Sequence, residues 1–186
     1  MSYCYLNLTE LPPLSNSLTS LYCYNNRLTR LPEQLPNTLT DLRCNNNRLT
    51  KLTKQLPNSL RWLYCSYNSL TRLPEQLHDS LTEVYCNNNR LTKLPEQLSD
   101  SLIYLSCRYN RLTVLPKQLP DTLIWLSCEN NPFLFNSRNN LKWFDQNNIS
   151  FNNYKVLVIL CKIRRNCNQN KPTSFNRDLT RLCNMY

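Results

Sequence analysis

The sequence contains no glycine and no alanine, and His78 is its only histidine. Without glycine, each backbone position that requires a positive φ angle must be filled by another residue, and asparagine is the best substitute. The chain has 28 asparagines, several of them in runs such as Asn45 to Asn47 and Asn87 to Asn89. We therefore expect asparagine at the tight corners of the chain.

Long apolar runs are absent as well. The longest, Val156 to Cys161, is far too short to span a bilayer, and Met1 to Cys4 lacks the basic start and apolar core of a signal peptide. We therefore expect an intracellular, cytoplasmic protein without a membrane span, whose ten cysteines are mostly reduced.

The net charge of +10 is unevenly distributed. Residues 1–136 hold 13 Lys and Arg against 10 Asp and Glu, whereas residues 137–186 hold 9 against 2. The basic character therefore belongs to the C-terminal part of the chain.

Six cysteines recur at intervals of 21 residues, and each lies within the same frame, which in its first full copy reads Leu18-x-x-Leu21-x-Cys23-x-x-Asn26-x-Leu28. The second half of the unit, Leu31 to Pro36 in that copy, is also regular. A fixed period of this length indicates identical coils stacked on one another. The cysteines are Cys23, Cys44, Cys65, Cys86, Cys107 and Cys128.

The frame resembles the leucine-rich repeat, L-x-x-L-x-L-x-x-N-x-L, with cysteine in place of the third leucine. The half-unit L-P-x-x-L-P resembles the short repeat of secreted bacterial effectors. The resemblance implies a solenoid of the α/β horseshoe class, a right-handed coil with a parallel β-sheet on its concave side. The Asn-rich composition also resembles leucine-rich-repeat proteins of amoeba-infecting giant viruses, which implies a role in host interaction.

The repeats divide the chain into two parts. Residues 1–136 form the predicted solenoid. Residues 137–186 form a small basic segment, for which the pattern predicts helices and for which we expect a capping role on the last coil. The alternative is that this segment binds nucleic acid or an acidic membrane surface. Within the solenoid we assign a partial repeat 1–16 and repeats 17–37, 38–58, 59–79, 80–100, 101–121 and 122–136.

A period of 21 residues is too short for a full helix on the convex side. We expect an extended, polyproline II-like or 3₁₀ segment there, in agreement with Pro32, Pro74 and Pro95. The alternation Leu21-x-Cys23 predicts a short strand with both side chains pointing inward. An asparagine column should bond backbone groups of adjacent coils: Asn26, Asn47, Asn68, Asn89, Asn110 and Asn131.

The cysteine column has three interpretations. Strands about 4.8 Å apart keep stacked Cβ atoms farther apart than a disulfide prefers. Zinc requires four ligands that converge on one point, which a straight row does not provide. We therefore favour thiols packed as small apolar groups over a disulfide stack or a metal site, and predict no metal and no cofactor.

Side chains that flank the inward positions of the strands should form the concave face. Aromatic and arginine side chains, which dominate interaction hot spots, are frequent there, although aromatic residues also favour strands for their own sake. The candidate partner-binding residues are Tyr22, Tyr24, Arg43, Trp62, Tyr64, Glu83, Tyr85, Tyr104, Arg108 and Trp125.

Two basic columns lie beyond the strands. The first holds Arg27, Arg48, Arg90 and Arg111, and the second holds Arg30, Lys51, Arg72 and Lys93. Glu33, Glu75 and Glu96 follow the second column by three residues, so we expect a largely neutralised, salt-bridged edge. The alternative is a track for a polyanion.

No catalytic constellation accompanies these patterns. Some effectors with this repeat type carry a C-terminal ubiquitin-ligase domain with a catalytic cysteine, but about 50 residues follow the repeats here and no acidic residue lies near Cys161, Cys167 or Cys183 as in the effectors' motif. The sequence therefore predicts a monomeric, non-enzymatic module that binds a protein partner, with polyanion binding as the alternative.

Overall fold

The computed structural model describes residues 1–128 and 130–132. The predicted C-terminal cap, residues 137–186, lies outside the described residues. The last repeat is described only to Pro132.

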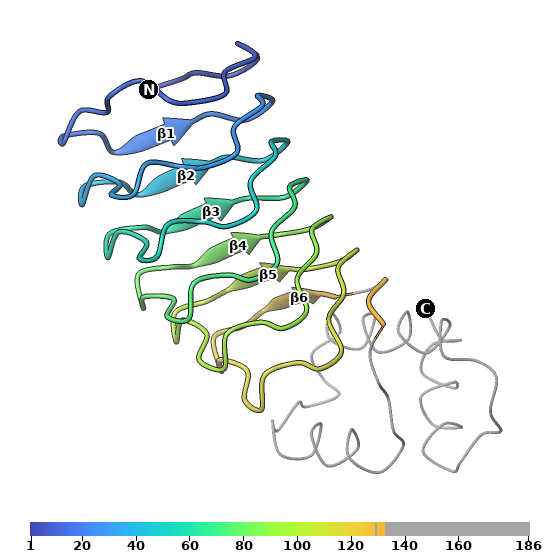
Figure 1. The fold of residues 1–186 in the computed structure, drawn as a ribbon. Coiled ribbons are helices and arrows are strands. Elements are labelled where there is room, and N and C mark those ends of the chain that lie inside the picture. Colours follow the sequence, from blue (N-terminus) through green and yellow to red (C-terminus); the bar gives the residue numbers. More distant parts are fainter. Residues whose placement is uncertain (129, 133–186) are drawn as a thin grey trace, which may run out of the picture.

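Six three-residue strands make one parallel sheet in the order β1-β2-β3-β4-β5-β6 (Figure 1). Neighbouring strands pair with a constant offset of one repeat, for example Leu21 with Leu42. Each coil therefore repeats the one before it, and the predicted parallel-sheet solenoid is confirmed. The strands are β1 Ser20–Tyr22, β2 Asp41–Arg43, β3 Trp62–Tyr64, β4 Glu83–Tyr85, β5 Tyr104–Ser106 and β6 Trp125–Ser127.

The segments that return from one strand to the next are extended. Within the described residues they contain bends and turns but neither α-helix nor 3₁₀ helix, so of the expected forms the extended one is observed. Prolines such as Pro32 and Pro74 fix φ and remove a backbone donor, which disfavours helical hydrogen bonding. An isolated parallel bridge joins Gln76 and Gln97 on this side.

The core consists of leucine columns with one cysteine column. Leu21 and Cys23 alternate inward across β1 and are fully buried, and the same positions are buried in every later coil. A single coil cannot bury these side chains on both of its faces, so each coil depends on its neighbours for apolar contact.

The asparagine column bonds adjacent coils together, as predicted. Asn47 Nδ2 donates to the carbonyl oxygen of Cys23 in the preceding coil, at 2.9 Å, and to that of Cys44 in its own coil, at 3.1 Å. Its Oδ1 accepts from the backbone N–H of Leu28, at 2.9 Å. Equivalent bonds recur from Asn26 to Asn131, and no buried side-chain N or O atom of the described residues lacks a partner.

The corner after each strand requires a positive φ angle. Asparagine supplies it at Asn25, Asn46 and Asn88, with φ of 56°, 53° and 53°, which agrees with the expectation for a chain without glycine. Two coils use tyrosine instead, since Tyr67 and Tyr109 have φ of 55° and 53°. The left-handed region is unfavourable for a bulky residue and several-fold more frequent for asparagine.

Replacing Asn68 by leucine should destabilise the solenoid by about 1–3 kcal/mol, because the backbone N–H of the buried residue Leu49 loses its only acceptor, at 2.9 Å. Thermal unfolding followed by circular dichroism measures the effect. Asn58→Leu, which removes an exposed amide, is the control and should melt near the wild type. An unchanged melting temperature for Asn68→Leu would contradict the structural role of the column.

Replacing Tyr67 or Tyr109 by asparagine should stabilise the fold by about 0.5–1 kcal/mol each, because asparagine tolerates the left-handed region better. At this chain length 1 kcal/mol corresponds to a rise of about 2–4 °C in melting temperature. The reverse change, Asn88→Tyr, should lower it. If all three variants melt alike, corner conformation does not limit stability here.

Candidate functional site: the concave face

The strand register brings the predicted binding residues together in rows. Trp62, Glu83, Tyr104 and Trp125 follow one another along the first row, and Tyr22, Arg43, Tyr64 and Tyr85 follow one another along the second. Tyr24 and Arg108 lie two residues beyond their strands. Arg108 is exposed and the other nine residues are half-buried, so the face combines fixed side chains with surface that a partner can reach.

The second row is a continuous stack of planar groups. The Cζ atom of Arg43 lies 4.9 Å from the ring centroid of Tyr22 and 4.9 Å from that of Tyr64. The rings of Tyr64 and Tyr85 stack in turn, with centroids 4.8 Å apart and planes 7° from parallel. Each coil contributes one member, so the coil spacing itself sets the stacking distance.

Two carboxylates hold this stack in place. Asp41, 4% exposed, accepts hydrogen bonds from Arg43 Nη2 at 3.1 Å and from Tyr22 Oη at 3.1 Å. Glu83 Oε2 accepts from Tyr64 Oη, at 2.9 Å. Burial, aided by the Glu83 bond, raises the pKa of Tyr64, and the Asp41 bond raises the pKa of Arg43. The rings are therefore neutral donors and the guanidinium stays charged.

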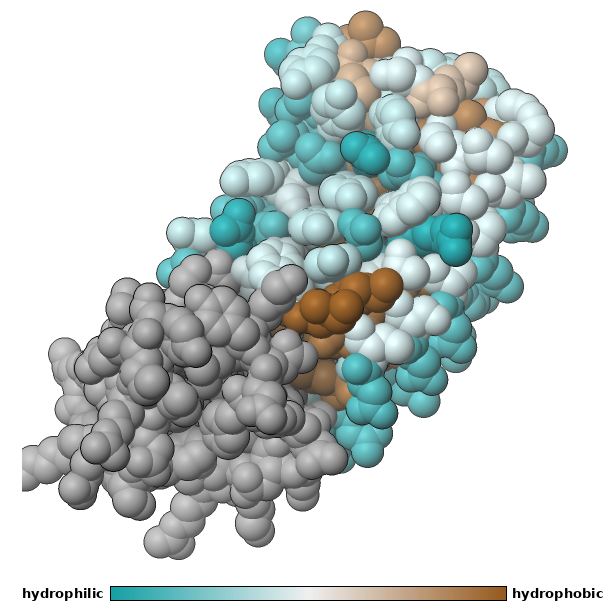
Figure 2. Space-filling view, turned by 180° about the vertical axis from the view of Figure 1, so that it is seen from behind, coloured by the Kyte–Doolittle hydropathy of each residue, from teal (hydrophilic) through white to brown (hydrophobic). Residues whose placement is uncertain are grey.

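The face changes character towards its C-terminal end. The second row ends in serine at Ser106 and Ser127, both buried. Sequence reasoning overlooked a further column one residue before each strand, in which Ile124 is 46% exposed and donates its backbone N–H to Ile103 O at 3.0 Å. Figure 2 shows an apolar patch at this end of the described chain. The same period that located the other rows could have found this one.

The prediction of a salt-bridged basic edge is wrong. No ion pair joins Glu33, Glu75 or Glu96 to the basic column in the described chain; Arg30 instead pairs with Glu10 of the preceding segment, at 2.6 Å. The expected pairing relied on a three-residue spacing that brings side chains together on a helix. In an extended segment three residues span about 10 Å, which separates the charges.

The six repeated cysteines are buried thiols that pack in the core. None of them is in a disulfide, and no group of three or more His, Cys, Asp or Glu within residues 1–128 and 130–132 could hold a metal ion. Burial raises the pKa of Cys23 and of Cys86 from 9.0 to about 12. A pKa raised by folding means that the thiols contribute stability that is complete below pH 9.0 and is lost as the pH rises towards about 12.

Iodoacetamide, which reacts with thiolates, should therefore leave Cys23 and Cys86 unlabelled at about pH 8 in the native protein. Peptide mapping by mass spectrometry identifies each site and separates these thiols from the cysteines near the C-terminus. The same reaction in denaturant is the control and should label all of them. Rapid native labelling of Cys86 would show that the core opens readily.

Comparisons with known proteins agree with this architecture. The family model described as Leucine Rich Repeat matches residues 17–37 and 59–79. No curated protein sequence matches the chain significantly. In the part of the chain that the structure describes, no helix is long and apolar enough to cross a membrane.

Solved structures of bacterial effectors share the fold. YopM, a leucine-rich effector protein from Yersinia pestis, is 37% identical with a TM-score of 0.65 over 70% of this chain and 36% of its own. YopM from Yersinia enterocolitica WA-314 is 41% identical with a TM-score of 0.67, over 70% and 29%. The leucine-rich-repeat domain of a Shigella effector is 28% identical with a TM-score of 0.61, over 81% and 76%.

The chain thus spans about a third of the length of the YopM proteins. Its matched repeats and its neighbours are those of a binding scaffold and not of an enzyme family. With a solenoid of identical coils, an asparagine column that joins them and effector repeats as structural neighbours, the chain is a leucine-rich-repeat protein of the bacterial effector-like type.

Proposed function

We propose that this chain is a non-enzymatic protein-interaction module that binds a protein partner on its concave face. The observation that carries the proposal is the row of Tyr22, Arg43, Tyr64 and Tyr85, which is already ordered by Asp41 and Glu83. A face that is rigid before binding loses little side-chain entropy when a partner arrives.

The first row supplies the groups that a partner would contact. Trp62, Tyr104 and Trp125 are half-buried, and none of their polar side-chain atoms bonds to a protein atom in the described chain. Large aromatic side chains with an unused polar tip are frequent anchors of protein interfaces. The likeness to effector repeats supports a role in which the module acts on host proteins in the host cytoplasm.

The substitution of Trp62, Tyr104 and Trp125 by alanine should abolish partner capture. Wild type and variant are immobilised, exposed to a eukaryotic cell lysate, and the retained proteins are identified by mass spectrometry. A protein retained by wild type and lost by the variant is the expected result, because three central anchors are removed.

Two controls make this experiment decisive. The variant must melt like the wild type, and Gln34→Ala/Gln55→Ala/Gln76→Ala, which alters one exposed column away from the strands, should retain the partner. If the concave-face variant captures the same material, and salt or nuclease removes it, the proposed function is wrong and the basic surfaces are the binding sites.

A further inference from the structure

The corners after the strands carry four exposed arginines, Arg27, Arg48, Arg90 and Arg111, which we call the arginine edge. The backbone N–H of each one donates to a leucine carbonyl of the preceding coil, at 2.8 to 2.9 Å. The backbone is thereby fixed and each side chain leaves the solenoid at the same point of its coil. In the third coil Ser69 takes this position.

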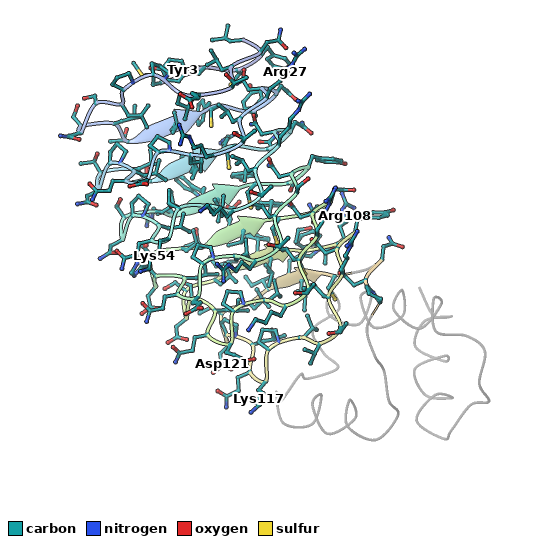
Figure 3. All side chains as sticks on the ribbon, in the orientation of Figure 1. Tyr3, Arg27, Lys54, Arg108, Lys117 and Asp121 are labelled. Atoms are coloured by element: carbon teal, nitrogen blue, oxygen red, sulfur yellow. The ribbon has the colours of Figure 1, made fainter. Side chains whose placement is uncertain are left out.

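No acidic group of the described residues forms an ion pair with the arginine edge. Among the described residues these four arginines make no ion pair, since the two salt bridges belong to Arg30 and Arg43. Coils that repeat at about 4.8 Å place like charges close together, so the edge holds a positive potential. Figure 3 shows Arg27 and Arg108 on the same side of the solenoid, opposite Lys54 and Lys117.

Two tyrosines lie in the same corners. Tyr67 and Tyr109 are 55% and 52% exposed, and each has a positive φ angle that asparagine adopts more readily. Neither ring belongs to the core, so core packing does not offset this conformation. An unfavourable backbone geometry at exposed side chains suggests a role in recognition.

We propose that the arginine edge, together with Tyr67 and Tyr109, binds an acidic segment of the protein that occupies the concave face. This inference rests on the proposed function and adds the chemistry of the partner. A peptide fits better than a nucleic acid, because Glu83 lies half-buried on the adjoining sheet without an ion pair in the described chain and would repel a phosphate backbone laid across it. A protein can confine its carboxylates to the edge and present apolar groups to the face.

The test uses the full chain and a fluorescein-labelled peptide of alternating glutamate and serine, with affinity measured by fluorescence anisotropy near physiological ionic strength. The edge variant is Arg27→Gln/Arg48→Gln/Arg90→Gln/Arg111→Gln. The matched control, Lys51→Gln/Lys54→Gln/Arg72→Gln/Lys93→Gln, removes the same charge from other exposed positions. We expect the edge variant to lose about tenfold in affinity, from four exposed charge pairs, and the control less than about threefold.

Tyr67→Asn/Tyr109→Asn separates binding from folding. This double variant should bind the peptide more weakly while it melts at a higher temperature than the wild type, so unfolding cannot explain the loss. The inference is overturned if the edge variant and the control weaken binding equally, or if the edge variant binds like the wild type. It is also overturned if labelled oligouridylate binds more tightly than the peptide through the same arginines.

The capture experiment distinguishes the two proposals. In one outcome, a partner is lost by the Trp62→Ala/Tyr104→Ala/Trp125→Ala variant and retained at full strength by the edge variant. That result supports binding on the concave face and contradicts a role of the arginine edge in binding. A partner lost by both variants and retained by the charge-matched control supports the edge as part of the same interface.

Discussion

The side-chain amide of the repeated asparagine is the interaction on which the rest of this structure depends. From Asn47 onward it donates to two cysteine carbonyls, one in its own coil and one in the coil before, and accepts a leucine N–H of that earlier coil; at Asn26 the earlier carbonyl is that of Tyr3. Because these partners belong to consecutive coils, the amide fixes how one coil stacks on the next. The leucine core adds apolar contact, but apolar contact is not directional and would not by itself specify a single stacking.

The recognition surface follows from that stacking. The guanidinium of Arg43 lies between the rings of Tyr22 and Tyr64 because three successive coils present their side chains in register. The carboxylates of Asp41 and Glu83 then fix the row laterally. The varying side chains of the second row are thus held in place by contacts between coils, which suits a face that distinguishes between partners.

The features tied to the period could be predicted from the sequence, whereas the pairing of individual charges could not. The alternation of Leu21 and Cys23 predicts a strand with two core side chains, and the position of Asn26 predicts a bond between coils. These predictions hold because every copy of the repeat needs the same core side chains and the same bond at these positions. Glu10 pairs with Arg30 across the irregular first repeat, where the frame gives no guidance. Likewise, no pattern distinguishes Asn46 from Tyr67 at the same corner, since the fold tolerates both side chains there.

The constant offset between paired strands also governs which insertions and deletions the chain can accept. Removal of one whole unit of 21 residues, such as 38–58, would pair Leu21 with Leu63, the present partner of Leu42. The parallel register would be kept and the concave face would lose one strand. A shift of one residue in strand register would instead turn leucines outward and tyrosines inward. The concave face can therefore lengthen or shorten by whole coils, whereas a change at Asp41 or Arg43 also removes a contact to Tyr22 in the coil before.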